Sequence, residues 1–175
     1  MKKQIYKYIN LSILITILVI IDQITKYLVV TKLNHHKNYS IVKHIFSFEY
    51  LENRGVAFGI LSGRLLLITI FVVVITIGIA YFMHILENCI RKNSSLSKRF
   101  TLLQIICAFL IAGAVGNLID RIRLGHVIDF IKFDFINFPT FNIADCYVTV
   151  ATLILFVTLM FFISEEDLNS LKFRK

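Results

Sequence analysis

Four aspartates lie within one stretch of the chain that begins in a strongly apolar segment and ends in the next. The stretch reads GNLIDRIRLGHVIDFIKFDFINFPTFNIAD, and its aspartates are Asp120, Asp129, Asp134 and Asp145. Carboxylates at the edge of hydrocarbon are costly to hold there and are usually functional. A short loop can bring Asp129 and Asp145 together. We therefore predict an aspartate dyad, in which an ionised carboxylate activates water and a protonated one donates to a carbonyl and a leaving amine.

The surroundings of the two aspartates favour different protonation states. Asn142 is a good N-cap for the last apolar segment, and Asp145 falls at its third helical position, as in a capping box. A plain helix cap explains this motif equally well on its own. The helix N-terminus favours an ionised Asp145. Asp129 lies between Ile128 and Phe130, where poor solvation raises the pKa of an aspartate.

Two further apolar segments carry polar residues on a single helix face. Asp22 and Lys26 are four residues apart, so they share a face and can form an ion pair. The simpler interpretation of this pair is structural, because buried pairs often fix helix packing, and the alternative is direct catalysis. Asn117, Asp120 and Arg121 also share a face. We expect Asp120 and Arg121 to anchor the end of their helix through mutual and loop hydrogen bonds.

The composition indicates a membrane protein. The chain has 175 residues, is 57% hydrophobic and has a mean hydropathy of +0.76. Four apolar segments are each close to the ~20 residues that a membrane-crossing helix needs. We predict an all-α membrane protein with four transmembrane helices in a single domain of residues 1–175, the spans being about 11–30, 65–83, 100–121 and 143–163. The first span shows no signal-peptide cleavage site, so we expect it to be retained.

The basic residues predict the orientation. The net charge is +8, but Lys and Arg cluster between the apolar segments, which favours topology setting and anionic lipid over nucleic acid. Ten of the 19 Lys and Arg lie in the two terminal tails and the loop between the second and third spans. We therefore expect both termini in the cytoplasm, external loops at 31–64 and 122–142, and a site facing the outer leaflet.

The two external loops contain strand patterns. Residues 46–50 alternate aromatic with polar side chains, and residues 127–138 alternate similarly. Asn53-Arg54-Gly55 is typical of a turn, after which residues 56–58 can pair back as a second strand. We predict a small sheet that both loops build as a cradle on the outer leaflet, with its aromatic face toward lipid.

Other chemistries are less well supported. Cys146 and His126 could form a thiol dyad, but Cys146 is one helical step from Asp145 and we expect it to point elsewhere. The histidines lack zinc-site spacing, so no metal is expected. A small four-span transporter or scaffold, with membrane carboxylates as proton or cation sites, remains the alternative. A transport path should place polar residues across the full depth, whereas here we expect every unusual polar residue to reach the same leaflet.

Five motifs resemble those of the lipoprotein signal peptidases, also called signal peptidase II, in family order and over nearly the whole chain. One departure is Val56, where alanine is more usual, and we expect only slight repacking from it. The motifs are Asp22-Gln23-Ile24-Thr25-Lys26, Asn53-Arg54-Gly55-Val56-Ala57-Phe58, Gly116-Asn117-Leu118-Ile119-Asp120-Arg121, Val127-Ile128-Asp129-Phe130 and Phe141-Asn142-Ile143-Ala144-Asp145.

The resemblance implies a monomeric aspartic endopeptidase of the bacterial inner membrane that needs no cofactor. Its substrates would be diacylglyceryl-modified prolipoproteins, cut on the N-terminal side of the lipidated cysteine, and its inhibitors would include cyclic lipopeptides. Asp129 and Asp145 carry over as the catalytic dyad. The resemblance also carries over substrate-positioning or dyad-supporting residues, which are Asn53, Asn117, Arg121 and Asn142.

Overall fold

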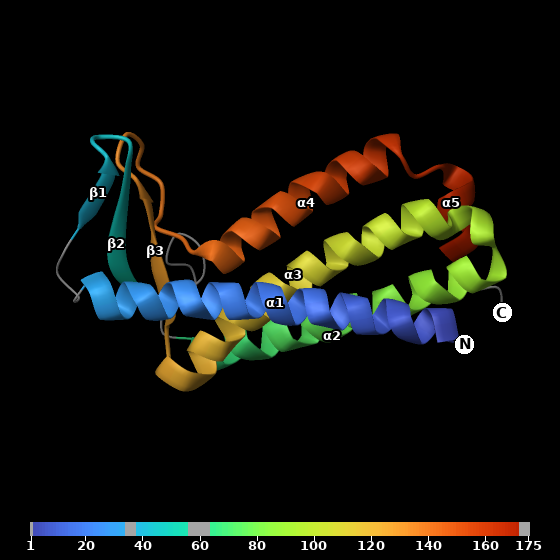
Figure 1. Cartoon of the computed structure of the whole chain (residues 1–175), viewed down its shortest axis with the longest axis horizontal. Helices are drawn as coiled ribbons and strands as arrows, with labels where there is room; N and C mark the ends of the chain where they lie inside the picture. The colour runs from blue at the N-terminus through green and yellow to red at the C-terminus, as the bar shows by residue number, and fades with distance from the viewer. Residues whose placement is uncertain (1, 34–37, 56–63, 172–175) are drawn as a thin grey trace.

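Four long helices lie along one axis with a small sheet at one end of them (Figure 1). The computed structural model describes residues 2–33, 38–55 and 64–171. The predicted class, four membrane-crossing helices with a small sheet, is confirmed. The helices are α1 (Lys2–Leu33), α2 (Leu65–Lys92), η2 (Ser94–Leu96), α3 (Ser97–Leu124), α4 (Ile143–Phe161) and α5 (Glu165–Leu171), and the strands are β1 (Tyr39–Val42), β2 (Phe46–Asn53) and β3 (Val127–Phe133).

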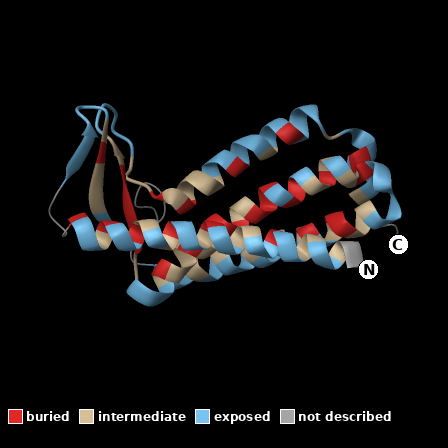
Figure 2. Ribbon diagram, viewed as in Figure 1, coloured by how far each residue is buried: buried red, intermediate tan, exposed pale blue. Residues whose placement is uncertain are grey.

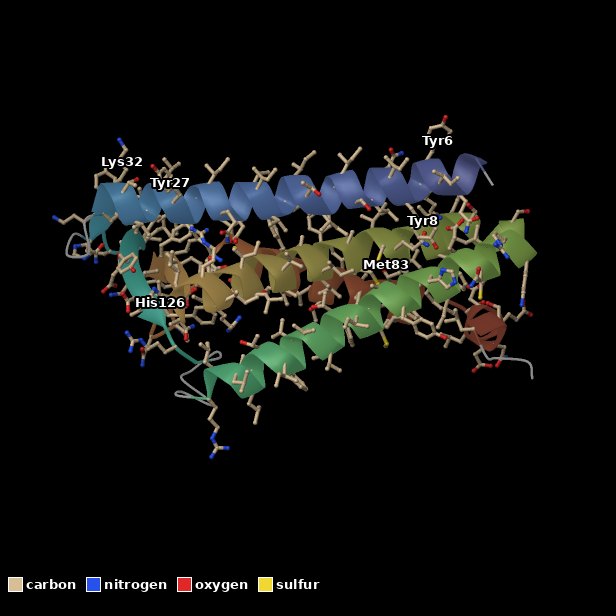
Figure 3. All side chains as sticks on the ribbon, turned by 90° about the horizontal axis from the view of Figure 1, so that it is seen from below. Tyr6, Tyr8, Tyr27, Lys32, Met83 and His126 are labelled. Atoms are coloured by element: carbon tan, nitrogen blue, oxygen red, sulfur yellow. The ribbon has the colours of Figure 1, made fainter. Side chains whose placement is uncertain are left out.

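Three of the helices are longer than the spans that hydropathy predicts. The helices α1, α2 and α3 have 32, 28 and 28 residues. Tyr6 and Tyr27 point out of the bundle near the two ends of α1 (Figure 3) and are exposed. They are separated by roughly 31 Å along the helix axis, close to the ~30 Å thickness of bilayer hydrocarbon. Tyrosines favour the membrane interface, so α1 extends beyond the hydrocarbon at both ends.

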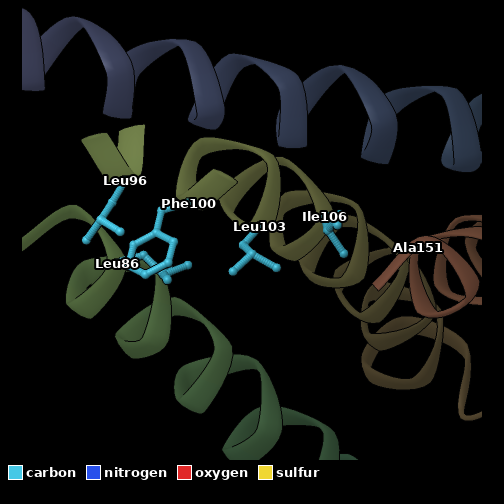
Figure 4. Packing of buried hydrophobic residues seen from close by; sticks show 6 residues of the cluster. All are labelled: Leu86, Leu96, Phe100, Leu103, Ile106 and Ala151. Atoms are coloured by element: carbon cyan, nitrogen blue, oxygen red, sulfur yellow. The ribbon is translucent and has the colours of Figure 1, made fainter. Parts of the chain in front are cut away.

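The helix α3 is the centre of the bundle. Half of its apolar window is buried, compared with 22% or less for the other three long helices, and Figure 2 shows buried residues along it. Small residues allow the close packing, because a Cβ at Gly113 would lie 2.5 Å from the backbone oxygen of Ala144 in α4. Away from the sheet, α2, η2 and α3 share an apolar cluster that Ala151 of α4 joins (Figure 4), formed by Leu86, Leu96, Phe100, Leu103 and Ile106.

A partly buried polar cluster lies in the half of the bundle away from the sheet. Lys7 of α1 donates to Glu87 of α2 and to Thr101 of α3, both at 2.9 Å. The fully buried Gln104 donates to the backbone oxygen of Met83 at 3.0 Å. The expectation that every unusual polar residue reaches one leaflet is therefore wrong. Glu87 lies beyond the predicted end of the second span, in the part of α2 that hydropathy did not include.

Both external loops build the sheet, as predicted. It is antiparallel with the order β1-β2-β3, and it pairs Asn53 with Val127 and Leu51 with Asp129. Gly125 ends α3 in the left-handed conformation, with φ +76°, which lets the chain turn directly into β3. The strand β1 was not predicted from the sequence. The strand predicted at residues 56–58 lies outside the described residues.

Candidate active site

Asp129 is buried in the middle of β3 and accepts hydrogen bonds from two asparagine amides. The Nδ2 of Asn53 donates to Asp129 Oδ2 at 2.8 Å, and the Nδ2 of Asn142 donates to Asp129 Oδ1 at 2.6 Å. Each asparagine also accepts through its Oδ1, from the backbone N–H of Gly55 and of Asp145 respectively, both at 3.0 Å. Because a backbone N–H can only donate, these contacts fix both amides with their donors toward Asp129.

Asp145 is held at the N-terminus of α4 by the predicted capping box. Its Oδ2 accepts the backbone N–H of Asn142 at 3.2 Å, and its Oδ1 accepts Nδ2 of Asn117 at 2.8 Å. The Oδ1 of Asn117 in turn accepts from the ammonium of Lys26 at 2.9 Å. Asn142 contacts both aspartates, so it joins the two carboxylates into one network.

Asp129 keeps its proton more readily than an ordinary aspartate. Burial raises the pKa of Asp129 to about 7, and the negative charge of Asp145 adds to the rise. The hydrogen bonds from Asn53 and Asn142 and the charge of Lys26 act in the opposite direction. The network therefore suits a pair of carboxylates that share one proton near neutral pH.

The two aspartates line one cavity with a volume of about 480 Å³. The cavity is also lined by polar residues of β2 and α3 and by an aromatic wall formed by Phe133, Phe138 and Phe141. The aromatic wall was not predicted as part of the site, although Phe138 and Phe141 flank the segment that contains the single proline of the chain. Among the described residues, no three His, Cys, Asp or Glu side chains are grouped to hold a metal ion.

Cys146 lines the same cavity, so the expectation that it points elsewhere is wrong. His126 is not the partner of this thiol. It lies at the start of β3 (Figure 3), with Nδ1 3.8 Å from Glu52 Oε2.

The predicted ion pair between Asp22 and Lys26 is present at 2.9 Å and is almost fully buried. Lys26 also pairs with Asp120 of α3 at 2.8 Å. Gln23, which was not predicted as a site residue, donates to Asp120 at 3.0 Å and to the backbone oxygen of Gly116 at 3.2 Å. The sequence signals for Gln23 were its place beside Asp22 in an apolar segment and its membership of the first family-like motif.

Arg121 lines the cavity and contacts the loop after β2. It donates to the backbone oxygens of Gly55 and Asn117, both at 3.4 Å. The hydrogen bonds found in the described part of the chain do not include the expected one between Asp120 and Arg121. Asp120 instead accepts from Lys26, Gln23 and the backbone N–H of Ile128, so the two residues anchor different elements.

A family comparison identifies the kind of protein that carries this site. The sequence profile described as signal peptidase (SPase) II matches residues 14–161, which include every site residue described above. The chain belongs to the signal peptidase II family. It is therefore a peptidase, and its four long apolar helices make it a multi-pass membrane protein.

Relatives in the signal peptidase II family match most of the chain. A protein named lipoprotein signal peptidase from the bacterium Caldanaerobacter subterraneus subsp. tengcongensis is 39% identical over 85% of this chain and 94% of its own length. One of the same name from Staphylococcus aureus is 34% identical over 87% of this chain and 90% of its own length. A solved structure titled as a bacterial membrane enzyme has a TM-score of 0.72 at 28% identity, covering 95% of this chain and 93% of that one.

Proposed function

We propose that this protein is an aspartic endopeptidase that removes signal peptides from diacylglyceryl-modified prolipoproteins, cutting on the N-terminal side of the lipidated cysteine. The observation that carries the proposal is that Asp129 and Asp145 line a common cavity. Three asparagine amides donate hydrogen bonds to these two carboxylates. The names of the bacterial relatives support the substrate class. One chain supplies both aspartates, so a monomer suffices.

In the proposed reaction, Asp145 is the ionised partner and Asp129 the protonated one. The capping hydrogen bond and the positive end of α4 favour a charge on Asp145, and burial favours the proton on Asp129. Asp145 accepts a proton from water as the water oxygen attacks the carbonyl carbon, while Asp129 protonates the carbonyl oxygen. The C–N bond then breaks, and the leaving amine takes a proton from the dyad.

The cavity walls suit a substrate that is a lipid-linked peptide. The aromatic rings of Phe133, Phe138 and Phe141 have centroids 5.4 to 6.2 Å apart and form an apolar wall beside the dyad, which we assign to the diacylglyceryl chains. A guanidinium carries five donors, so Arg121 retains donors for a backbone carbonyl of the substrate. Both products then stay at the membrane surface, and we place this cavity at the outer leaflet.

Cleavage by purified aspartate variants tests the proposal. We expect Asp129→Asn and Asp145→Asn each to lower kcat by about 10³-fold or more, because an amide replaces the group that accepts or donates the proton. The double variant should be hardly worse than either single one, since the pair acts as a unit. The measurement is turnover of a diacylglyceryl-modified prolipoprotein, with mass spectrometry to identify the lipidated cysteine as the new N-terminal residue.

Asp134→Asn is the matched control, because Asp134 is exposed just beyond β3 and bonds to Ser47 rather than to the dyad. This variant should cleave at the wild-type rate. Ordinary cleavage by either dyad variant would refute the aspartic mechanism. Wild-type protein that never cleaves lipidated substrate, but loses an ion flux on mutation, would favour the transporter alternative.

A further inference from the structure

Lys26 is the residue around which the buried polar network is arranged. It is 1% exposed, and its ammonium has three N–H donors. Three acceptors lie at hydrogen-bonding distance, namely Asp22 Oδ2 at 2.9 Å, Asp120 Oδ2 at 2.8 Å and Asn117 Oδ1 at 2.9 Å. All donors of the buried charge are thus used inside the protein.

Each of the two carboxylates on Lys26 also holds a backbone N–H next to one member of the dyad. The Oδ1 of Asp22 accepts the N–H of Ala144 at 3.0 Å, and Ala144 directly precedes Asp145. The Oδ2 of Asp120 accepts the N–H of Ile128 at 3.3 Å, and Ile128 directly precedes Asp129. Lys26 of α1 is therefore linked to the backbone of α4 through one carboxylate and to the backbone of β3 through the other.

The third contact acts on Asp145 through a side chain. A lysine ammonium can only donate, so the Asn117 oxygen must face Lys26. This fixes the Nδ2 of Asn117 toward Asp145 Oδ1, where it donates at 2.8 Å. The Nδ2 of Asn142 donates to the same oxygen at 3.0 Å, so Lys26 and Asn142 together orient the Asn117 amide.

We propose that Lys26 is a positioning residue for the peptidase reaction, fixing both aspartates through Asp22, Asp120 and Asn117. This inference rests on the proposed function. A solely structural role explains the arrangement less well, because replacing a buried ion pair by apolar groups of similar size is often neutral for stability or increases it. The contacts of this cluster run instead to the residues that set the separation and orientation of the dyad.

A double variant that removes the ammonium of Lys26 together with the charge of Asp22 tests the role. In Lys26→Met/Asp22→Asn, the new amide still accepts from Ala144, and Asp120 keeps its bonds from Gln23 and Ile128. We expect kcat to fall by about 10²-fold, because small misplacements of reacting groups cost about that much. The KM for lipidated substrate and the thermal midpoint should change little.

The control removes the half-buried ion pair away from the sheet, in which the Lys7 side chain is 22% exposed. Lys7→Met/Glu87→Gln deletes a pair with the same 2.9 Å separation that makes no contact with the described residues of the site. A solely structural role for both pairs predicts a change in thermal midpoint and no change in kcat for either variant. The positioning role predicts a loss of kcat only in the variant at Lys26.

Single variants at Asp22 complete the test even if the double variant does not insert. Asp22→Asn keeps an acceptor for the Ala144 N–H and should retain kcat within a few-fold, whereas Asp22→Ala removes it and should lower kcat by at least about 10-fold. Equal kcat values for these two variants, or a wild-type kcat at Lys26→Met/Asp22→Asn, would overturn the inference. If the Asp129 and Asp145 variants remained active, the proposed function itself would fail instead.

Discussion

Asp129 is the residue whose ionisation should set the alkaline limit of activity. Its pKa is raised to about 7, first by burial and then by the charge of Asp145. Below this pH the side chain carries the proton that the carbonyl oxygen needs, and above it the donor is lost. We expect kcat/KM to fall on the alkaline side of pH 7, and to fall again in acid as the second carboxylate becomes protonated. A pH profile of cleavage that is flat through pH 7 would contradict this assignment.

Asn53 should tune this alkaline limit. The hydrogen bond from the Asn53 amide lowers the pKa of Asp129, and the charge of Lys26 acts in the same direction. Arg121 faces the same carboxylate from α3. Asn53→Ala removes the amide donor, so it should lower the maximal rate and move the alkaline limb to higher pH. Asn93→Ala, which removes a cap at the other end of the bundle, should leave the profile unchanged.

The polar site residues were predictable because few explanations account for short polar side chains in apolar segments. Asp22, Asn117 and Asp145 each stand out against hydrocarbon neighbours, and the structure brings all three into one network. The ion pair of Asp22 and the capping box of Asp145 were predictable because their partners lie nearby in the sequence. The contacts between distant segments were not. Asp120 contacts Lys26 and a strand N–H rather than Arg121, because the approach of α1 to α3 depends on packing between distant segments.

At the scale of the element, the closeness of α1, α3 and α4 depends on glycine. A Cβ at Gly116 would lie 2.5 Å from Asp22 Oδ2 and 3.3 Å from the Cβ of Ala144. We expect Gly116→Ala to push the Asp22 carboxylate away from the Ala144 N–H. The variant should lose about 1 to 3 kcal/mol of stability from overpacking, together with much of its activity, as measured by thermal unfolding and cleavage.

Gly78→Ala is the matched control for Gly116→Ala. Gly78 lies in α2, and a Cβ there would meet no atom within 4 Å. Alanine has the higher helix propensity, by about 1 kcal/mol, so this variant should keep its activity and be at least as stable as the wild type. Equal behaviour of the two alanine variants would show that close approach at Gly116 is not required.

The elements were predictable to different degrees. The pattern of residues 46–50 predicted β2 because its two faces differ in polarity. The strand β1 has four residues that are all exposed, so neither burial nor alternation marks it in the sequence. Its pairing with β2 depends on the fold of the whole loop. The helices run past the predicted spans because backbone hydrogen bonding continues into the polar interface, where apolar composition no longer marks the helix.

The two ends of the whole molecule carry different groups of polar residues. The sheet and the dyad occupy one end, while α5 and the start of α1 lie at the other (Figure 1). The hydropathy pattern predicted the four spans because crossing hydrocarbon requires about 20 apolar residues. It did not predict the cluster of Lys7, Glu87 and Gln104, because a charge near a helix end resembles an ordinary interfacial residue until its partners are known.

The charge distribution predicts which end faces the cytoplasm. Ten of the 19 Lys and Arg lie in the terminal tails and the loop between α2 and α3, and positively charged loops are retained inside. With the native cysteines replaced by alanine, Ser40→Cys on the exposed β1 should react with an impermeant maleimide in intact cells, whereas Ser94→Cys should react only after permeabilisation. The reverse pattern would contradict the proposed placement of the dyad at the outer leaflet.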